Sequence, residues 1–177
     1  MSPSKDGPVD FEIVLRDLER VLQQNLGKGL EVKCFDTEDF TKAGDNYGST
    51  LLKVRAIIKR NCDAHEEELN LVAKMLPPTK IQREIFESSF TFKKEIFIYE
   101  HLLPAYEKIY GKTFNVLPKF YGSRMSIKYD NEEVDEDVVI LLENLKLKGY
   151  YMGDRHKGKY YLSWVIINYC MKKLCQI

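Results

Sequence analysis

Residues 68–78, ELNLVAKMLPP, place one lysine inside an otherwise apolar run. The apolar residues before the two prolines are typical of a buried β-strand that ends at the prolines. Side chains alternate along a strand, so Lys74 shares a face with Val72 and Leu76. A lysine on such a face must bind a carboxylate or an anion, or reach water along its stem. The alternative is an edge strand, on which an exposed lysine prevents pairing with other sheets.

The composition is that of an ordinary globular domain or of part of a larger one. Of 177 residues, 44% are hydrophobic, which is enough for a core, and the 27 basic and 27 acidic residues cancel. This balance argues against a nucleic-acid partner. No apolar signal segment or membrane-spanning stretch is evident, so we expect a cytoplasmic protein without a membrane partner. The four cysteines form no CxxC pair, so we expect reduced thiols and no zinc site.

The segment before this strand predicts a helix followed by a β-hairpin. Residues 10–26 have helical spacing, with Asp10 as a candidate N-cap and Gly27 as a stop. Residues 30–40 and 49–59 are extended runs that flank a polar tip. The tip contains Gly44, Asp45, Asn46, Tyr47, Gly48 and Ser49. It is either an ordinary turn or a glycine-rich loop whose amides cover phosphates; it matches neither a Walker A motif nor a complete G-x-G-x-x-G.

The segment after this strand, residues 77–111, predicts helix in two pieces. Glu95 falls at the edge of the apolar stripe that includes Phe92 and Tyr99. A carboxylate that faces inward needs a cation, so we expect an ion pair between Glu95 and Lys74. The alternative is that Glu95 is a solvated residue at the side of the helix.

Two further strands are expected within residues 115–129 and 137–145, joined by an acidic turn. Residues 138–142 are all apolar, which predicts a strand buried on both faces. Glu143, Asn144 and Leu145 follow it directly. Their backbone groups cannot all continue the sheet, so they are free to meet the edge of a ligand. An ordinary exit from a strand into a loop is the alternative.

Taken in order, these elements resemble the small lobe of the protein-kinase-like fold, and more closely the ecdysteroid kinase-like (CHK kinase-like) family, relatives of choline and aminoglycoside phosphotransferases. The segments that carry the resemblance are AGDNYGSTLLKV (43–54), LVAKMLPP (71–78), FKKEIFIYEHLLP (92–104), LPKFYG (117–122) and VVILLENLKLKGYYMGDRHKG (138–158). We therefore expect an α+β fold: a kinase-like small lobe of antiparallel sheet plus helices, with an N-terminal helix and only the start of a large lobe. The expected divisions are a helical segment at 1–29, a nucleotide-binding lobe at 30–145 and a truncated, divergent tail at 146–177.

The resemblance also implies how the site would work. The loop 44–49 would fold over the phosphates of ATP, and Lys74 would contact the α- and β-phosphates with its ammonium fixed by Glu95. The Glu143 carbonyl and the Leu145 amide would address the adenine edge. In complete relatives, the γ-phosphate passes to a hydroxyl of a steroid or another small metabolite, with Mg²⁺ as cofactor.

The motifs of the second lobe are not found in this sequence. Family members carry a base and metal ligands in H-G-D-x-W-x-x-N and D-x-Q; none of His65, His101 and His156 precedes Gly-Asp, and no D-x-Q occurs. The resemblance is expected to end near Gly158. We therefore expect a truncated chain that has no catalytic or metal-binding residues and is inactive alone. The alternatives are a lobe-only interaction protein without catalysis and a lipid- or hormone-binding α+β domain unrelated to kinases.

Overall fold

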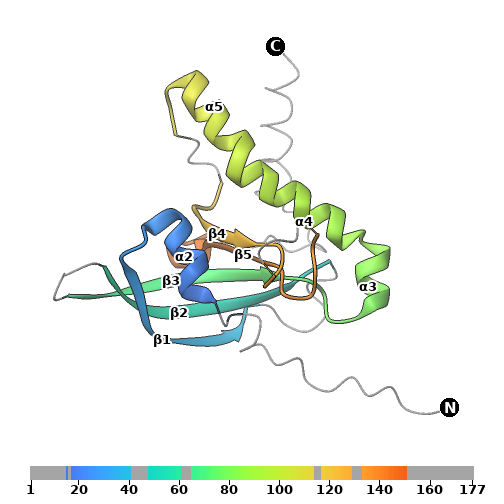
Figure 1. The fold of residues 1–177 in the computed structure, drawn as a ribbon, viewed down its shortest axis with the longest axis horizontal. Coiled ribbons are helices and arrows are strands. Elements are labelled where there is room, and N and C mark those ends of the chain that lie inside the picture. Colours follow the sequence, from blue (N-terminus) through green and yellow to red (C-terminus); the bar gives the residue numbers. More distant parts are fainter. Residues whose placement is uncertain are drawn as a thin grey trace.

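The computed structural model describes Leu15 and residues 17–40, 48–60, 65–113, 117–128 and 133–150. These residues form a five-stranded antiparallel sheet with helices, in agreement with the α+β small-lobe prediction (Figure 1). The predicted loop residues Gly44 to Tyr47, the candidate cap Asp10 and the tail beyond residue 150 lie outside the described residues.

The sheet places the strand of Lys74 at its centre. Its strands are β1 (Leu30–Asp39), β2 (Thr50–Arg60), β3 (Glu66–Met75), β4 (Phe120–Arg124) and β5 (Val139–Glu143). The strand order is β1-β2-β3-β5-β4, so β5 inserts between β3 and β4. Lys74 is flanked by Leu51 on β2 and by Ile140 on β5. The edge-strand interpretation of Lys74 is therefore wrong, because β3 pairs on both sides.

The helices lie where they were predicted except at the start of the first one, which was expected over 10–26 and, within the described residues, begins at Leu18. They are α2 (Leu18–Leu26), α3 (Lys80–Ile85), α4 (Ser88–Phe97), the π-helical turn η1 (Ile98–Leu102), α5 (Leu103–Tyr110) and the 3-10 turn η2 (Leu145–Lys148). The chain leaves α2 at Gly27, which has a φ of 100° and so favours a residue without a side chain. The predicted break within 77–111 falls before α4, where Glu87 has a φ of 45°. From α4 the helix runs through η1 into α5 without a further break.

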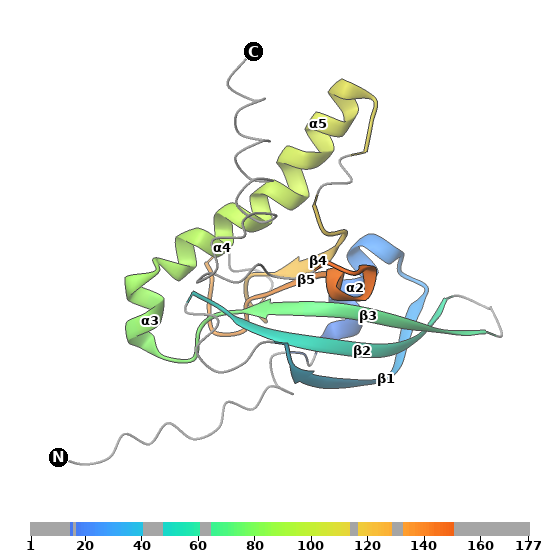
Figure 2. The ribbon, with the colours of Figure 1, turned by 180° about the vertical axis from the view of Figure 1, so that it is seen from behind.

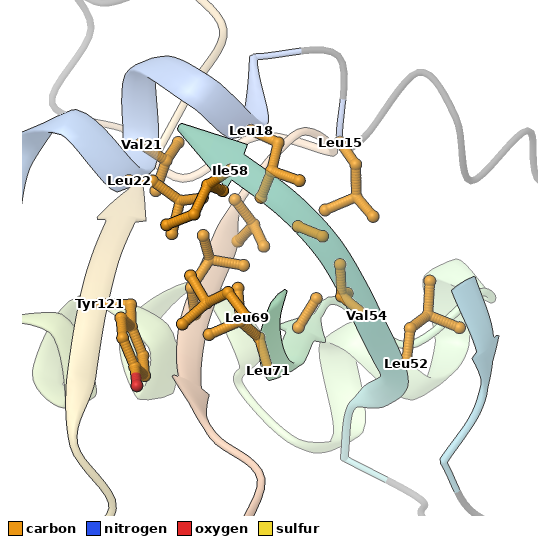
Figure 3. Close-up of a cluster of buried hydrophobic side chains, with 14 of the residues drawn as sticks. Leu15, Leu18, Val21, Leu22, Leu52, Val54, Ile58, Leu69, Leu71 and Tyr121 are labelled. Atoms are coloured by element: carbon orange, nitrogen blue, oxygen red, sulfur yellow. The ribbon is translucent and has the colours of Figure 1, made fainter. Parts of the chain in front are cut away.

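One face of the sheet is covered by α2, as the two opposite views show (Figures 1 and 2). Leu18, Val21 and Leu22 point from the helix into a cluster with Val54 and Leu71 of the central strands (Figure 3). These side chains are buried, and each contributes about 1.5–3 kcal/mol by leaving water. The core on this face thus fixes β2 and β3 and leaves their opposite side chains, including Lys74, to face the other way.

The second face is covered in part by α4. Phe92 and Ile96 pack against Leu76 and Ile140 in a smaller buried cluster. Phe92 and Ile96 are spaced four apart, so they lie on one side of the helix. The residue between them that faces the same sheet is Glu95, one position before Ile96. Packing of α4 therefore determines where the Glu95 carboxylate lies.

A close approach between α2 and β4 makes Gly122 sensitive to substitution. Its φ is 147°, and a Cβ added there would lie 2.3 Å from the Val21 carbonyl oxygen. We expect Gly122→Ala to lower the free energy of unfolding by about 2–4 kcal/mol, from backbone strain and overpacking together. Gly111→Ala is the matched control, because Gly111 has a φ of 62° and nothing within 4 Å. Urea denaturation that gave equal losses for both variants would contradict this assignment.

Candidate functional site

The predicted ion pair between Lys74 and Glu95 is present. The Lys74 Nζ lies 2.5 Å from Glu95 Oε2, and the two side chains are 22% and 23% exposed. The ammonium also lies 5.6 Å from the centroid of the Phe92 ring. The interpretation of Glu95 as a solvated flank residue is therefore wrong. The pair is partly buried but still reaches the surface, so its charges remain accessible to a ligand.

Contacts one turn beyond Glu95 hold this part of the helix against the sheet. The Tyr99 ring stacks on Phe120 of β4 with centroids 5.1 Å apart. Ser123 Oγ donates to the Glu100 carboxylate at 2.6 Å. Both contacts come from η1, where the wider π-helical turn brings these two adjacent residues to β4. Burial, with a smaller contribution from Glu95, raises the pKa of Tyr99, so the ring packs as a neutral group.

An apolar strip lies beside Lys74 on the same face of the sheet. It consists of Leu51, Val72 and Leu142. Leu51 is opposite Lys74, and Leu142 is opposite Val72. Residues opposite each other in antiparallel strands share a face, and so do residues two apart in one strand. The strip therefore runs from the ion pair towards the end of β5.

Glu143, at the end of β5, has a structural partner for its carboxylate. Glu143 Oε1 lies 2.6 Å from the Lys148 Nζ, and the backbone N–H of Glu143 donates to the Lys119 carbonyl at 2.9 Å. Burial opposes ionisation of Glu143, but hydrogen bonds from Lys148 and Lys119 together with their charges lower its pKa. The carboxylate thus holds the chain in place where it leaves β5. Only the backbone of Glu143 remains for contact with a ligand.

Replacement of Glu143 should change how stability depends on pH. A carboxyl group whose pKa is lowered by folding stabilises the fold fully at pH values above its pKa in the unfolded state. This stabilisation disappears as pH falls through its pKa in the folded state. We expect Glu143→Gln to lower the free energy of unfolding by up to about 1 kcal/mol at pH 7. This loss should shrink as pH falls below the ordinary pKa of 4.5 and vanish once pH has fallen through the lowered pKa of the folded state. Urea denaturation between pH 3 and 8 measures this difference. A loss that is the same at every pH would contradict it.

Asn144 and Leu145 turn the chain away from the sheet. Asn144 is buried, and its Oδ1 accepts a hydrogen bond from the Lys146 N–H at 3.2 Å, which caps η2. Leu145 is the first residue of η2, and the first amides of a helix have no acceptor within it. The Leu145 N–H is therefore suited to an outside acceptor, whereas the Asn144 side chain acts as a cap.

The described part of the predicted loop lies near the corner between α3 and α4. Gly48 is so placed that an added Cβ would lie 3.7 Å from the Phe86 ring. Ser49 directly precedes β2, whose second residue, Leu51, is opposite Lys74. The structure thus brings Lys74 and Glu95 into contact. It places Gly48 and Ser49 at one end of the apolar strip and Glu143 to Leu145 at the other.

One contact at this site was missed by the sequence analysis. The Lys146 Nζ donates to the Phe40 carbonyl oxygen at 2.8 Å and lies 3.8 Å from the centroid of the Phe40 ring. These residues are far apart in sequence, and no spacing rule connects them. The available signal was the position of Lys146, directly after the predicted ligand edge at Leu145.

The described residues do not fit a metal site. Within them, no group of three or more His, Cys, Asp or Glu side chains is close enough to hold an ion. A hollow between α2 and β1 lies away from the apolar strip, and none of the predicted site residues lines it. Within the described part of the chain, no helix has the length and apolar character needed to cross a membrane.

Comparisons with known proteins identify a family. The model of the ecdysteroid kinase-like family matches residues 43–177. The match extends to residue 177, beyond Gly158, where the resemblance was expected to end. An Arabidopsis thaliana protein named for a B3 domain is 34% identical over 73 residues, which cover 36% of this chain and 58% of that protein. This chain thus spans little more than half the length of that relative. No solved structure is significantly similar.

Proposed function

Because this chain belongs to the ecdysteroid kinase-like family, and so has a kinase-like phosphotransferase fold, we propose that it binds ATP on the face of the sheet that carries Lys74. The observation that carries this proposal is the partly buried ion pair of Lys74 with Glu95 at the centre of the sheet. Partial burial of a charged side chain costs folding free energy, so a lysine on a central strand suggests a functional role. Its ammonium is a compact positive charge, which suits a phosphate ligand.

Lys74 binds the α- and β-phosphates in this proposal. Glu95 holds the ammonium in place and lowers the cost of removing it from water, and Phe92 packs beside it. The end of the loop at Gly48 and Ser49 adjoins the same position, so backbone amides there are available to phosphate oxygens.

The adenine ring lies on the apolar strip in this proposal. Leu51, Val72 and Leu142 offer apolar side chains from three adjacent strands, β2, β3 and β5, on one face of the sheet. The Glu143 carbonyl and the Leu145 N–H lie at the end of this strip and supply one acceptor and one donor to the purine edge. A small number of polar groups at the rim of an apolar surface is the usual arrangement of a ligand site.

The chain positions ATP but is proposed to lack turnover by itself. Transfer to a hydroxyl needs a base and metal ligands, and the family motifs that carry them are not in this sequence. The described residues hold no magnesium site, so no step here depends on one. The acceptor class, a steroid or another small hydroxyl-bearing metabolite, is proposed from family membership alone.

Thermal stabilisation by ATP tests the proposal. Contacts from one lobe predict a dissociation constant in the millimolar range, or roughly −4 kcal/mol. ATP at about five times that constant stabilises the fold by about 1 kcal/mol, which raises the melting temperature by about 2–4 °C. Adenosine, which lacks phosphates, should give a smaller shift. No shift at any soluble ATP concentration would contradict ATP binding and favour the interaction-protein alternative.

An activity assay tests the absence of turnover. The purified chain with ATP, Mg²⁺ and a panel of ecdysteroids and choline-like alcohols should give no phosphorylated product by mass spectrometry. Product that forms with the wild type, but neither with heat-killed protein nor with Lys74→Ala, would show that the chain carries its own catalytic groups.

A further inference from the structure

Lys146 connects two strands that are not neighbours in the sheet. Lys146 lies in η2, directly beyond β5, and its ammonium contacts both the carbonyl oxygen and the ring of Phe40, directly beyond β1. β2 and β3 lie between β1 and β5. At about 4.8 Å per strand, the connection spans about 14 Å of the sheet.

The register shows which face this connection crosses. Asp39 is opposite Leu52, and the Phe40 N–H donates to the Leu51 carbonyl at 3.1 Å, so Phe40 continues the ladder opposite Leu51. Leu51 is in turn opposite Lys74. Phe40 therefore belongs to the Lys74 face, and a side chain that reaches it from beyond β5 must cross β2 and β3 on that face. The apolar strip lies on this path.

We propose that Phe40 and Lys146 form a strap that closes the outer side of the apolar strip, and that a ligand enters the strip only when the strap opens. The identity of the ligand as a nucleotide rests on the proposed function. The covering of the strip by the strap does not depend on that function. The strap consists of one cation–π contact and one hydrogen bond near the surface, which are individually weak. The free-energy cost of opening the strap is therefore small. Loss of the strap should raise the fraction of molecules with an accessible strip about three- to tenfold.

Thiol labelling measures this access without any nucleotide. Leu51→Cys places a thiol on the strip, and Val72→Cys is a second, nearly isosteric probe. Labelling by a small maleimide, followed peptide by peptide with mass spectrometry, should be about three- to tenfold faster when Lys146→Ala is added. The exposed Cys34 is the internal reference. Equal labelling rates with and without Lys146 at both probe positions would overturn the strap.

Matched variants separate the strap from general effects of charge. Phe40→Leu removes the ring and should accelerate labelling as Lys146→Ala does. Lys146→Arg keeps a cation and its hydrogen-bond donors. The probe cysteine should therefore be labelled as slowly with Lys146→Arg as with Lys146 unchanged. Lys93→Ala, on the exposed side of α4, should also leave the rate unchanged. Acceleration by Lys93→Ala would overturn the strap by showing that any lost lysine loosens the fold.

Binding kinetics with a fluorescent ATP analogue separate the strap from the proposed function. Lys146→Ala should raise the association rate about three- to tenfold. An unchanged association rate together with accelerated labelling would overturn the strap as an entry gate. Accelerated labelling with no nucleotide binding by any variant would overturn the proposed function and support the strap as a cover of the strip.

Discussion

Lys74→Ala is expected to abolish the rise in melting temperature that ATP produces in the wild type. Loss of hydrogen bonds from a charged donor costs about 1.5–3 kcal/mol, which is roughly a 10- to 150-fold loss of affinity. At the same ATP concentration, less than about 0.3 kcal/mol of stabilisation would remain. The shift is measured for each variant against its own melting temperature without ATP, so that loss of the ion pair does not enter the comparison.

Two controls separate phosphate binding from other effects of this change. Lys93→Ala removes an exposed lysine of α4 and should keep the full ATP-dependent shift. Lys74→Ala combined with Glu95→Gln removes both charges of the ion pair, so repulsion between Glu95 and ATP cannot explain its failure to bind. A double variant that regained the shift would contradict direct phosphate binding by Lys74.

Phe92→Ala is expected to lower the free energy of unfolding by about 3–5 kcal/mol. The Phe92 side chain is fully buried between α4 and the sheet, in the cluster with Leu76 and Ile140. Truncation of a buried phenylalanine loses the transfer free energy of the ring and leaves a cavity. Urea denaturation measures the loss.

Phe97→Ala is the matched control for this prediction. Phe97 lies on the same helix but its side chain is 54% exposed. Substitutions at exposed positions usually change stability by less than about 0.5 kcal/mol. Similar losses for Phe92→Ala and Phe97→Ala would mean that α4 is not fixed by the buried cluster, and the placement of Glu95 by that packing would then be wrong.

Local patterns were sufficient to predict most of the elements. The extended run predicted at 49–59 is β2, which spans Thr50–Arg60. The inward positions of Lys74 and Glu95 followed from periodicity in a strand and in a helix, and the demand of each charge for a partner then predicted the ion pair. These features depend on residues that are close together in the chain, so the sequence pattern alone was enough to predict them.

Features that depend on residues distant in sequence were not predictable in the same way. The insertion of β5 between β3 and β4 removed the edge-strand alternative for Lys74, but no local pattern specifies strand order. The contact between Lys146 and Phe40 arises only when η2 turns back over the sheet. The break at Glu87, with its positive φ, was expected only as an approximate boundary, because glutamate rarely adopts that backbone conformation.

Phosphorus NMR of ATP is the measurement that tests the central claim most directly, because it reports the environment of each phosphate. With the wild-type chain, the α- and β-phosphate signals should shift or broaden as protein is added, in the millimolar range of affinity. With Lys74→Ala they should stay where they are in free ATP, and with Lys93→Ala they should behave as with the wild type. Equal changes with the wild type and with Lys74→Ala, or none with either, would contradict phosphate binding by Lys74.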